Sequence, residues 1–279
     1  MRLSRFVTLF VALAAITACG DDEITDPGVP PLAGVRFVNA LSDTGAVDVS
    51  MIDQVNWSFS NIEGYAFRAG SEHQPIAAGS RAIRVFPNSQ NAAIASTILL
   101  DTTITFNANT NYTLLLTGSA RANTEAFVLI EDNPPAAAAN QIALRVFNVT
   151  PVAIDAYATD TTTTAIAPPA AAANVAAVAP SAYVAFATAG RRAIRVTPAG
   201  SGTVSASGAG PAAVAPLVGQ LPAAGVNSSG TAFSVYYFPA GVPGSVTAPA
   251  AGTGNCAGAT PLASCNPTVI WFVDRVPTS

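Results

Sequence analysis

The feature of this sequence that most constrains its fold is an internal repeat. The segment Arg81–Pro87 recurs as Arg192–Pro198 with six of seven positions identical, and Val35–Asn39 recurs as the similar Leu144–Asn148. Solenoid units repeat every 20–50 residues or so, whereas these matches lie a whole domain apart. The repeat therefore predicts two tandem domains of the same fold.

The matching segments place the domain boundaries. We expect a first domain at 35–133, a linker at 134–141 that begins with Pro134-Pro135, and a second domain at 142–277. The final matched pair, Asp132 and Asp274, is further apart than the earlier matches. The second domain therefore carries additional residues late in its length.

Two stretches of the second domain are of low complexity. Thr161–Pro180 is rich in Thr, Ala and Pro, and Ser201–Gly230 is rich in Gly, Ala, Ser and Pro. Both have little apolar bulk with which to form a core. We expect mobile loops there, including at the Pro-bracketed run Ala170–Ala179.

The hydrophobic pattern alternates with period two, which is typical of strands. Arg84 is flanked by Ile83 and Val85, and Tyr112, Leu114 and Leu116 fall on one face of their segment. About seven such segments per domain, separated by turn residues, predict an antiparallel β-sandwich of roughly 100 residues. The fold class is therefore all-β, with two tandem β-sandwich domains.

The N-terminus carries an export signal. Arg2 and Arg5 precede an apolar run, Phe6–Ala15, that is shorter than the roughly 20 residues a membrane span needs. The sequence Ile16-Thr17-Ala18-Cys19 follows and resembles a bacterial lipobox. We expect residues 1–18 to be a signal peptide and Cys19 to carry lipid, the alternative being an ordinary signal peptide with an incidental cysteine.

Residues 19–34 contain an acidic run and three prolines, and we expect them to form a solvated tether. Gly20, rather than an aspartate, follows the cysteine. The chain is thus expected to be exported and lipid-anchored in the bacterial cell envelope, at the outer membrane on its periplasmic side or at the cell surface.

Composition argues against several functional classes. The formal net charge is −4, all 12 basic residues are arginine, and no basic stripe occurs, so no nucleic-acid partner is expected. His73, in a polar loop where we expect it to be solvated, is the only histidine. No nucleophile elbow, phosphate loop or zinc motif occurs. We expect no enzymatic activity, no cofactor and no metal.

Cys256 and Cys265 remain as an even pair once Cys19 is lipidated, and they border a short loop before the last predicted strand. In an oxidising compartment such a pair favours a disulfide. A metal or redox pair is the alternative, and neither CxxC spacing nor a second histidine supports it.

Several acidic residues are candidate sites. Asp48 and Asp155 recur at equivalent positions, and we expect each to satisfy turn backbone groups or to pair with a repeated arginine, Arg36 or Arg145. A Ca²⁺ site at Asp43 and Asp48 is the alternative, without the ligand spacing of a calcium loop. A glycosidase pair was considered from four glutamates, which nothing in the sequence brings together: Glu63, Glu72, Glu125 and Glu131.

Aromatic residues supply the candidate ligand-binding positions. Trp57 and Tyr65 in the first domain and Tyr236 in the second are candidates for a face that stacks on carbohydrate. The alternative, that these rings belong to the cores, is the commoner role of aromatics in a β-sandwich.

The repeated pattern resembles the bacterial family catalogued as domain of unknown function 4397. The first domain carries the resemblance at Val35–Asn39, Ser42-Asp43, Ala46–Val49, Ala78-Gly79 and Arg84–Pro87. The second carries it at Leu144–Asn148, Thr150-Pro151, Ile154–Tyr157, Ala189-Gly190 and Arg195–Pro198. Both copies depart from the motif in their first loop. The resemblance implies tandem immunoglobulin-like (Ig-like) modules of exported proteins, and it implies no reaction.

The sequence therefore predicts a non-enzymatic cell-envelope lipoprotein whose two Ig-like modules serve structural or adhesive interactions with a protein or glycan ligand. A glycan-binding accessory lipoprotein is the second hypothesis, and a hydrolase with an unrecognised site is the third.

Overall fold

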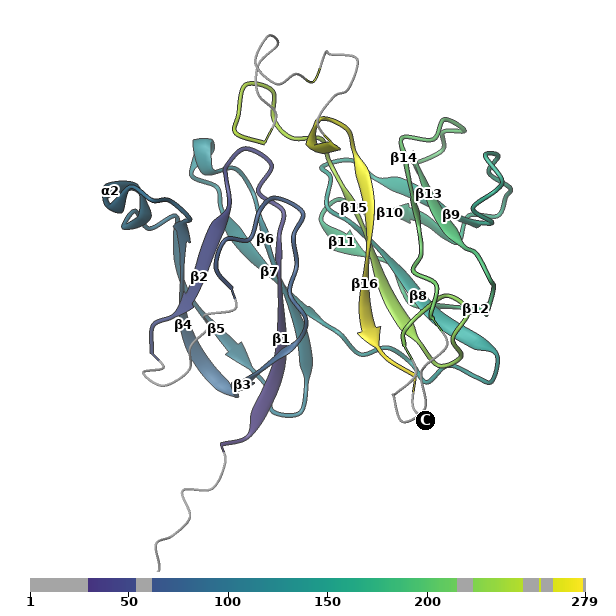
Figure 1. The fold of residues 1–279 in the computed structure, drawn as a ribbon, viewed down its shortest axis with the longest axis horizontal. Helices are drawn as coiled ribbons and strands as arrows, with labels where there is room; N and C mark the ends of the chain where they lie inside the picture. The colour runs from purple at the N-terminus through teal and green to yellow at the C-terminus, as the bar shows by residue number, and fades with distance from the viewer. Residues whose placement is uncertain (1–29, 54–61, 215–222, 248–255, 257–262, 278–279) are drawn as a thin grey trace, which may run out of the picture. The chain divides into compact units, whose positions relative to one another are not determined.

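The computed structural model describes residues 30–53, 62–214, 223–247, 256 and 263–277. The chain from Leu32 onward is one compact unit. The regular secondary structure of its described residues is almost wholly β-strand (Figure 1), which confirms the all-β prediction. The predicted signal peptide, Cys19 and Trp57 lie outside the described residues. None of the helices in the described ranges is long and apolar enough to cross a membrane.

The chain up to Glu131 forms two facing sheets. Its elements are β1 (Leu32–Asn39), β2 (Val47–Met51), β3 (Gln74–Ala77), β4 (Gly79–Pro87), α2 (Ala92–Ala95), β5 (Leu100–Phe106), β6 (Asn111–Thr117), the 3₁₀ turn η1 (Ala120–Ala122) and β7 (Ala126–Glu131). One sheet has the order β3-β1-β6-β7 and the other β2-β4-β5. All neighbours are antiparallel except β1 and β6, which run parallel.

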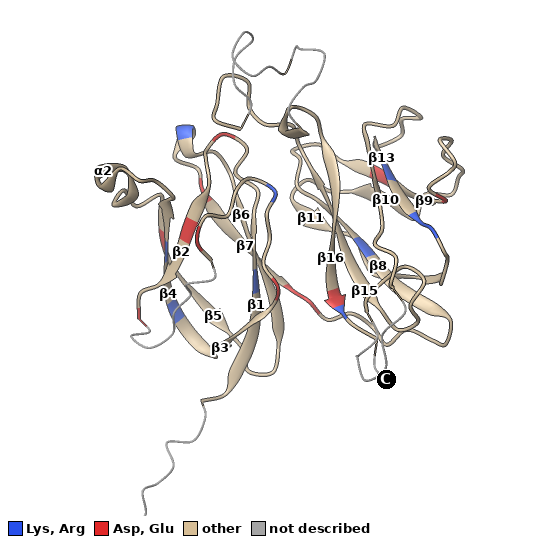
Figure 2. Cartoon of the chain, viewed as in Figure 1, with Lys and Arg blue, Asp and Glu red and all other residues tan. Residues whose placement is uncertain are grey.

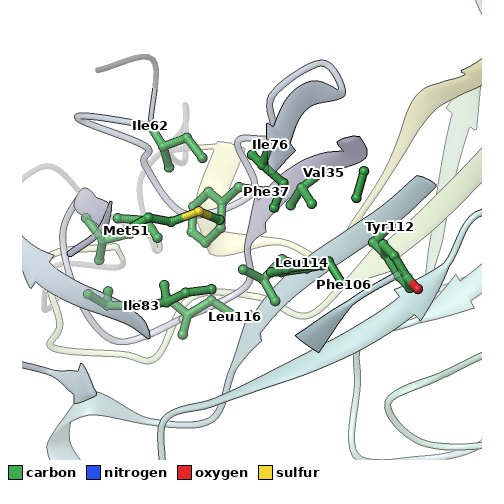
Figure 3. Packing of buried hydrophobic residues seen from close by; sticks show 14 of the residues in the cluster. Val35, Phe37, Met51, Ile62, Ile76, Ile83, Phe106, Tyr112, Leu114 and Leu116 are labelled. Carbon is green, nitrogen blue, oxygen red and sulfur yellow. The ribbon is translucent and has the colours of Figure 1, made fainter. Parts of the chain in front are cut away.

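The core of this first half lies between its two sheets (Figure 3). Ile83 and Val85 point into it while Arg84 is half-exposed, as the alternation predicts. Tyr112, Leu114 and Leu116 of β6 also point into it, so the predicted face is confirmed.

The chain from Gln141 forms a second pair of sheets. Its elements are β8 (Gln141–Asn148), β9 (Ile154–Thr159), β10 (Ala172–Val175), β11 (Ala179–Pro180), β12 (Val184–Ala187), β13 (Ala193–Pro198), β14 (Ala206–Ala209), β15 (Ala232–Phe238), the 3₁₀ turn η2 (Ala263–Cys265) and β16 (Thr268–Arg275). The sheet orders are β11-β8-β15-β16, with β12 also on β8, and β10-β9-β13-β14. Here β8 and β15 are the parallel pair.

The low-complexity stretches are more ordered than the sequence analysis expected. β10 pairs with β9, and β14 pairs with β13. Val175 and Val226 are buried in the core of the second half. An edge strand gains its backbone hydrogen bonds from one neighbour and needs little apolar bulk of its own, so alanine and glycine are sufficient there.

A third apolar cluster joins the two halves. It contains the outward-facing residues of one sheet from each half: Val38, Ala40, Leu115, Ile130, Phe147, Val149, Tyr236 and Phe238. Strands β6 and β15 are consequently buried on both faces, with the patterns eBBBBBi and BBBBBBB. A strand with one face in water would alternate between buried and exposed residues. The inner sheets of both halves are therefore covered on each side.

Candidate functional site

Four charged side chains are buried where the two halves meet, beside the third apolar cluster. Arg36 lies on β1, Asp132 directly follows β7, Arg145 lies on β8 and Asp274 lies on β16. Figure 2 shows basic segments on β1 and β8 and an acidic one at the end of β16. Each of the four residues is less than a tenth exposed. Ionised side chains are rarely this buried unless they are paired.

The ion pairs cross between the halves. Arg36 Nη2 of the first half lies 2.7 Å from Asp274 Oδ1 of the second and 3.3 Å from Asp132 Oδ2 of its own. Arg145 Nη2 of the second half donates in turn to Asp132 Oδ1 of the first. Two cations thus meet two anions, and the group of four, here called the ionic cluster, is neutral.

One hydroxyl from each half completes the cluster. Thr113 Oγ1 on β6 accepts from Arg36 Nε at 3.0 Å and donates to Asp132 Oδ2 at 2.6 Å. Ser234 Oγ on β15 accepts from Arg145 Nε at 2.7 Å and donates to Asp274 Oδ2 at 2.7 Å. Each hydroxyl therefore links the arginine of its own half to an aspartate. The two halves contribute the same three kinds of group.

Two further side chains bind the aspartates. Tyr183 Oη donates to Asp274 Oδ2 at 2.7 Å, and the Arg145 guanidinium lies over the Tyr183 ring. His73 Nε2 lies 2.9 Å from Asp132 Oδ2. The expectation that His73 is solvated was wrong. Its loop passes beside β1, so the ring covers Asp132 and is only 17% exposed.

The surroundings fix the charge states. Burial works against ionisation of Asp132, but His73, the two arginines and Thr113 together hold its pKa below the ordinary value. Burial likewise opposes the charge on Arg36, yet the neighbouring aspartates raise its pKa. Asp132, Arg36 and Arg145 are therefore ionised at neutral pH. Each is already hydrogen-bonded, which leaves neither a free base nor an activated nucleophile in the cluster.

Of the predicted aromatic candidates, Tyr65 and Tyr236 are described by the structure, and these two do not form one face. Tyr236 is fully buried, stacked on Phe147 with ring centroids 5.0 Å apart, and burial raises its pKa to about 12. No ligand reaches this ring, so its prediction as a binding residue was wrong. Tyr65 is half-buried and packs edge-on against Phe37 at 5.8 Å, which leaves it as a rim residue of the first core.

The aspartates proposed for turns or calcium all accept local hydrogen bonds. Asp48 accepts from Gly64 N and the Asn88 side chain, and Asp155 accepts from Asn174 N and Gly200 N. The backbone-satisfying role is thus confirmed, whereas pairing with Arg36 or Arg145 was wrong.

Asp43 accepts from Ser119 Oγ and from the backbone N–H groups of Ala120 and Arg121 at the start of η1. These three hydrogen bonds occupy the Asp43 carboxylate, which the calcium-site hypothesis assigned to binding Ca²⁺. Within the described ranges, no three acidic, His or Cys residues are grouped to hold a metal.

Cys256 and Cys265 are joined by a disulfide with their Cα atoms 5.2 Å apart, as the sequence predicted. The glutamates considered for a glycosidase pair, Glu63, Glu72, Glu125 and Glu131, are half-buried to exposed, and none is in an ion pair of the described residues.

A polar hollow of about 440 Å³ borders the ionic cluster. It is lined by Asn109, Thr110, Asn111, Glu131, Asp132, Asn133, Pro134, Asp274 and Arg275. Arg275 fixes one wall by donating to the carbonyl oxygens of Pro134 and Pro135, at 3.1 and 2.7 Å. No local sequence pattern marks this hollow, because its residues come from three separate strand ends.

Comparison with protein families matches residues 33–157, from β1 into β9, to a domain of unknown function, DUF4397. No curated protein matches. Among solved structures, a family 26 carbohydrate-binding module of Amy13K from Eubacterium rectale, crystallised with maltoheptaose, is 12% identical. The alignment covers 74% of this chain and 91% of that one with a TM-score of 0.21, too low to bear on fold or ligand.

Replacing Asp132 tests the ionic cluster. Asp132→Asn removes the anion that both arginines contact, and a broken buried ion pair typically costs about 3–5 kcal/mol of the free energy of unfolding. The matched control is Asp101→Asn, because the Arg84–Asp101 pair is solvent-exposed and should be worth less than about 1 kcal/mol. Urea denaturation measures both, and equal effects would contradict the assigned role.

The pKa of Asp132 also predicts a pH dependence. Its ordinary value is 3.8 and the folded value is lower. The stabilisation is therefore complete above pH 3.8 and is lost as the pH falls through the folded pKa. The difference in unfolding free energy between wild type and Asp132→Asn should be constant above about pH 5 and shrink in more acidic solution. A difference that is unchanged down to pH 2.5 would contradict this assignment.

Proposed function

We propose that this chain is an exported, lipid-anchored, non-enzymatic protein of the bacterial cell envelope. In this proposal, its two tandem Ig-like domains act as one rigid module for structural or adhesive interaction. In the same proposal, the lipid on Cys19 anchors the chain to the outer membrane.

The observation that carries the proposal is the ionic cluster. A flexible pair of domains would separate Arg36 from Asp274 and Arg145 from Asp132 each time the halves parted, which leaves Asp274 and Arg145 unpaired at a large cost. Every charge of the cluster is instead satisfied across the contact. A module of this kind holds a fixed distance between its ends, which suits a spacer or an adhesive stalk.

The strand pairing is consistent with two copies of one domain. In the first half the Arg36 strand runs parallel to β6, and in the second the Arg145 strand runs parallel to β15. Thr113 and Ser234 face these arginines from the parallel neighbours. The same arrangement of arginine and hydroxyl in both halves supports a tandem repeat, although the family match alone spans only residues 33–157.

The anchor is tested at Cys19. Cys19→Ala removes the thiol that accepts the lipid, so metabolic labelling with alkyne palmitate should be abolished and the chain should leave the membrane fraction. Cys256→Ser serves as the control and should be labelled like wild type. Continued labelling of the Cys19→Ala chain would contradict the anchor.

Glycan binding is the second candidate, and the polar hollow favours it. Asn109, Asn111 and Asn133 are exposed there. Each side-chain amide offers two donors and one acceptor, which suits the hydroxyl groups of a sugar.

A glycan array tests this candidate with residues 32–279. Binding should be lost in Asn111→Ala combined with Asn133→Ala and retained in Ser80→Ala, which lies on β4. A wild-type chain that binds no glycan, or a double variant that binds as well as wild type, would remove this candidate. Trp57→Ala on the same array tests the aromatic hypothesis separately.

A further inference from the structure

Arg68 makes a second set of contacts between the halves, separate from the ionic cluster. It has φ = 75° and is buried in the loop between β2 and β3. Its guanidinium donates to four carbonyl oxygens of the second half: Pro239 at 2.5 Å, Ala263 at 2.9 Å, Ser264 at 3.4 Å and Asn266 at 2.5 Å. The same group lies 4.7 Å from the centre of the Phe67 ring.

These carbonyl groups take the place of a counter-ion. No carboxylate of the described residues forms a salt bridge with Arg68, and burial lowers its pKa to about 10. The side chain is still cationic at neutral pH. A buried cation without a carboxylate depends on oriented dipoles, so the positions of the four oxygens matter.

Three of the four carbonyl groups lie in the turn that the disulfide closes, and the fourth belongs to Pro239. Ala263 and Ser264 belong to η2, which ends at Cys265, and Asn266 follows directly. Cys265 is bonded to Cys256. Gly241 N donates to Ser264 O at 2.7 Å, which joins the turn to the segment that follows β15.

That segment also reaches the first half. Val242 N donates to Ser42 O at 2.8 Å. Arg121 Nη2 donates to Gly244 O at 2.8 Å. Residues 239–247 and 263–266, here called the clasp, therefore contact the first half at three places: Arg68, Ser42 and Arg121.

We propose that the clasp is a redox-controlled latch between the halves. Formation of the Cys256–Cys265 bond restricts η2 to the conformation in which its carbonyl oxygens converge on Arg68. Reduction by a dithiol, which is itself oxidised to a disulfide, frees η2 from that conformation, and Arg68 then loses its acceptors at Ala263, Ser264 and Asn266. A disulfide acts in this way by removing alternative conformations of the loop that it closes.

The chemistry needs an oxidant of the protein-disulfide class. The two cysteine thiols exchange with its disulfide, so that one S–S bond forms here, one breaks there, and two thiols of the oxidant result. Such oxidants act outside the cytoplasm, so the latch closes only after export. Closure after export rests on the proposed function, whereas the contacts of the clasp do not.

Hydrogen exchange followed by NMR tests the latch on residues 32–279. Dithiothreitol should raise the exchange rates of the Gly241 and Val242 amides at least about tenfold, as expected for local opening. Amides of β1 and β8 should keep their rates. Arg68→Gln in the oxidised chain should give the same two increases, and Cys256→Ser with Cys265→Ser should reproduce the reduced protein.

Arg84→Gln is the matched control, because Arg84 pairs with Asp101 at the surface, and it should leave both amides unchanged. Three outcomes would overturn the latch. The first is unchanged exchange on reduction. The second is an Arg68→Gln chain that behaves like wild type. The third is faster exchange throughout β1 and β8, which would indicate that the disulfide stabilises the whole fold rather than the clasp.

Discussion

The structure depends on the neutral ionic cluster of Arg36, Asp132, Arg145 and Asp274. These groups lie within apolar surroundings, where an unpaired charge is far more costly than a paired one. Each arginine reaches an aspartate of the other half. Neither half can therefore expose or rotate its inner sheet without leaving charges unpaired. The apolar residues around the cluster favour contact, and the ion pairs determine which contact forms.

The cluster explains why the inner strands are unusual. A β-sandwich that stood alone would leave the outer face of β6 in water, yet Thr113 and Leu115 there are fully buried. Thr113 donates a hydrogen bond to Asp132 of the ionic cluster, and Leu115 belongs to the apolar cluster around it. Directional hydrogen bonds admit one register of the two sheets, whereas apolar side chains alone would tolerate several. The clasp at Arg68 then holds the same two halves at a separate set of residues.

The sequence was sufficient to predict the strands, but it was insufficient to predict the contact between the two halves. Period-two alternation placed Ile83, Arg84 and Val85 correctly because one face of β4 meets water. The alternation does not predict β10 and β14, because an edge strand needs no apolar bulk to pair with its one neighbour. The repeat had matched Arg36 with Arg145 and Asp132 with Asp274. The repeat does not reveal that the repeated arginine of one copy pairs with the repeated aspartate of the other copy. Their partners are 238 and 13 residues away, and no local pattern encodes such distances.

The ionic cluster requires the two halves to tumble as one body. Backbone amide relaxation of residues 32–279 measures it directly, through the rotational correlation times of β4 in one half and β13 in the other. The account predicts a single correlation time, fitting a rigid particle of the full mass, that splits in the Asp132→Asn chain. Two distinct, shorter correlation times in the wild-type protein would contradict it.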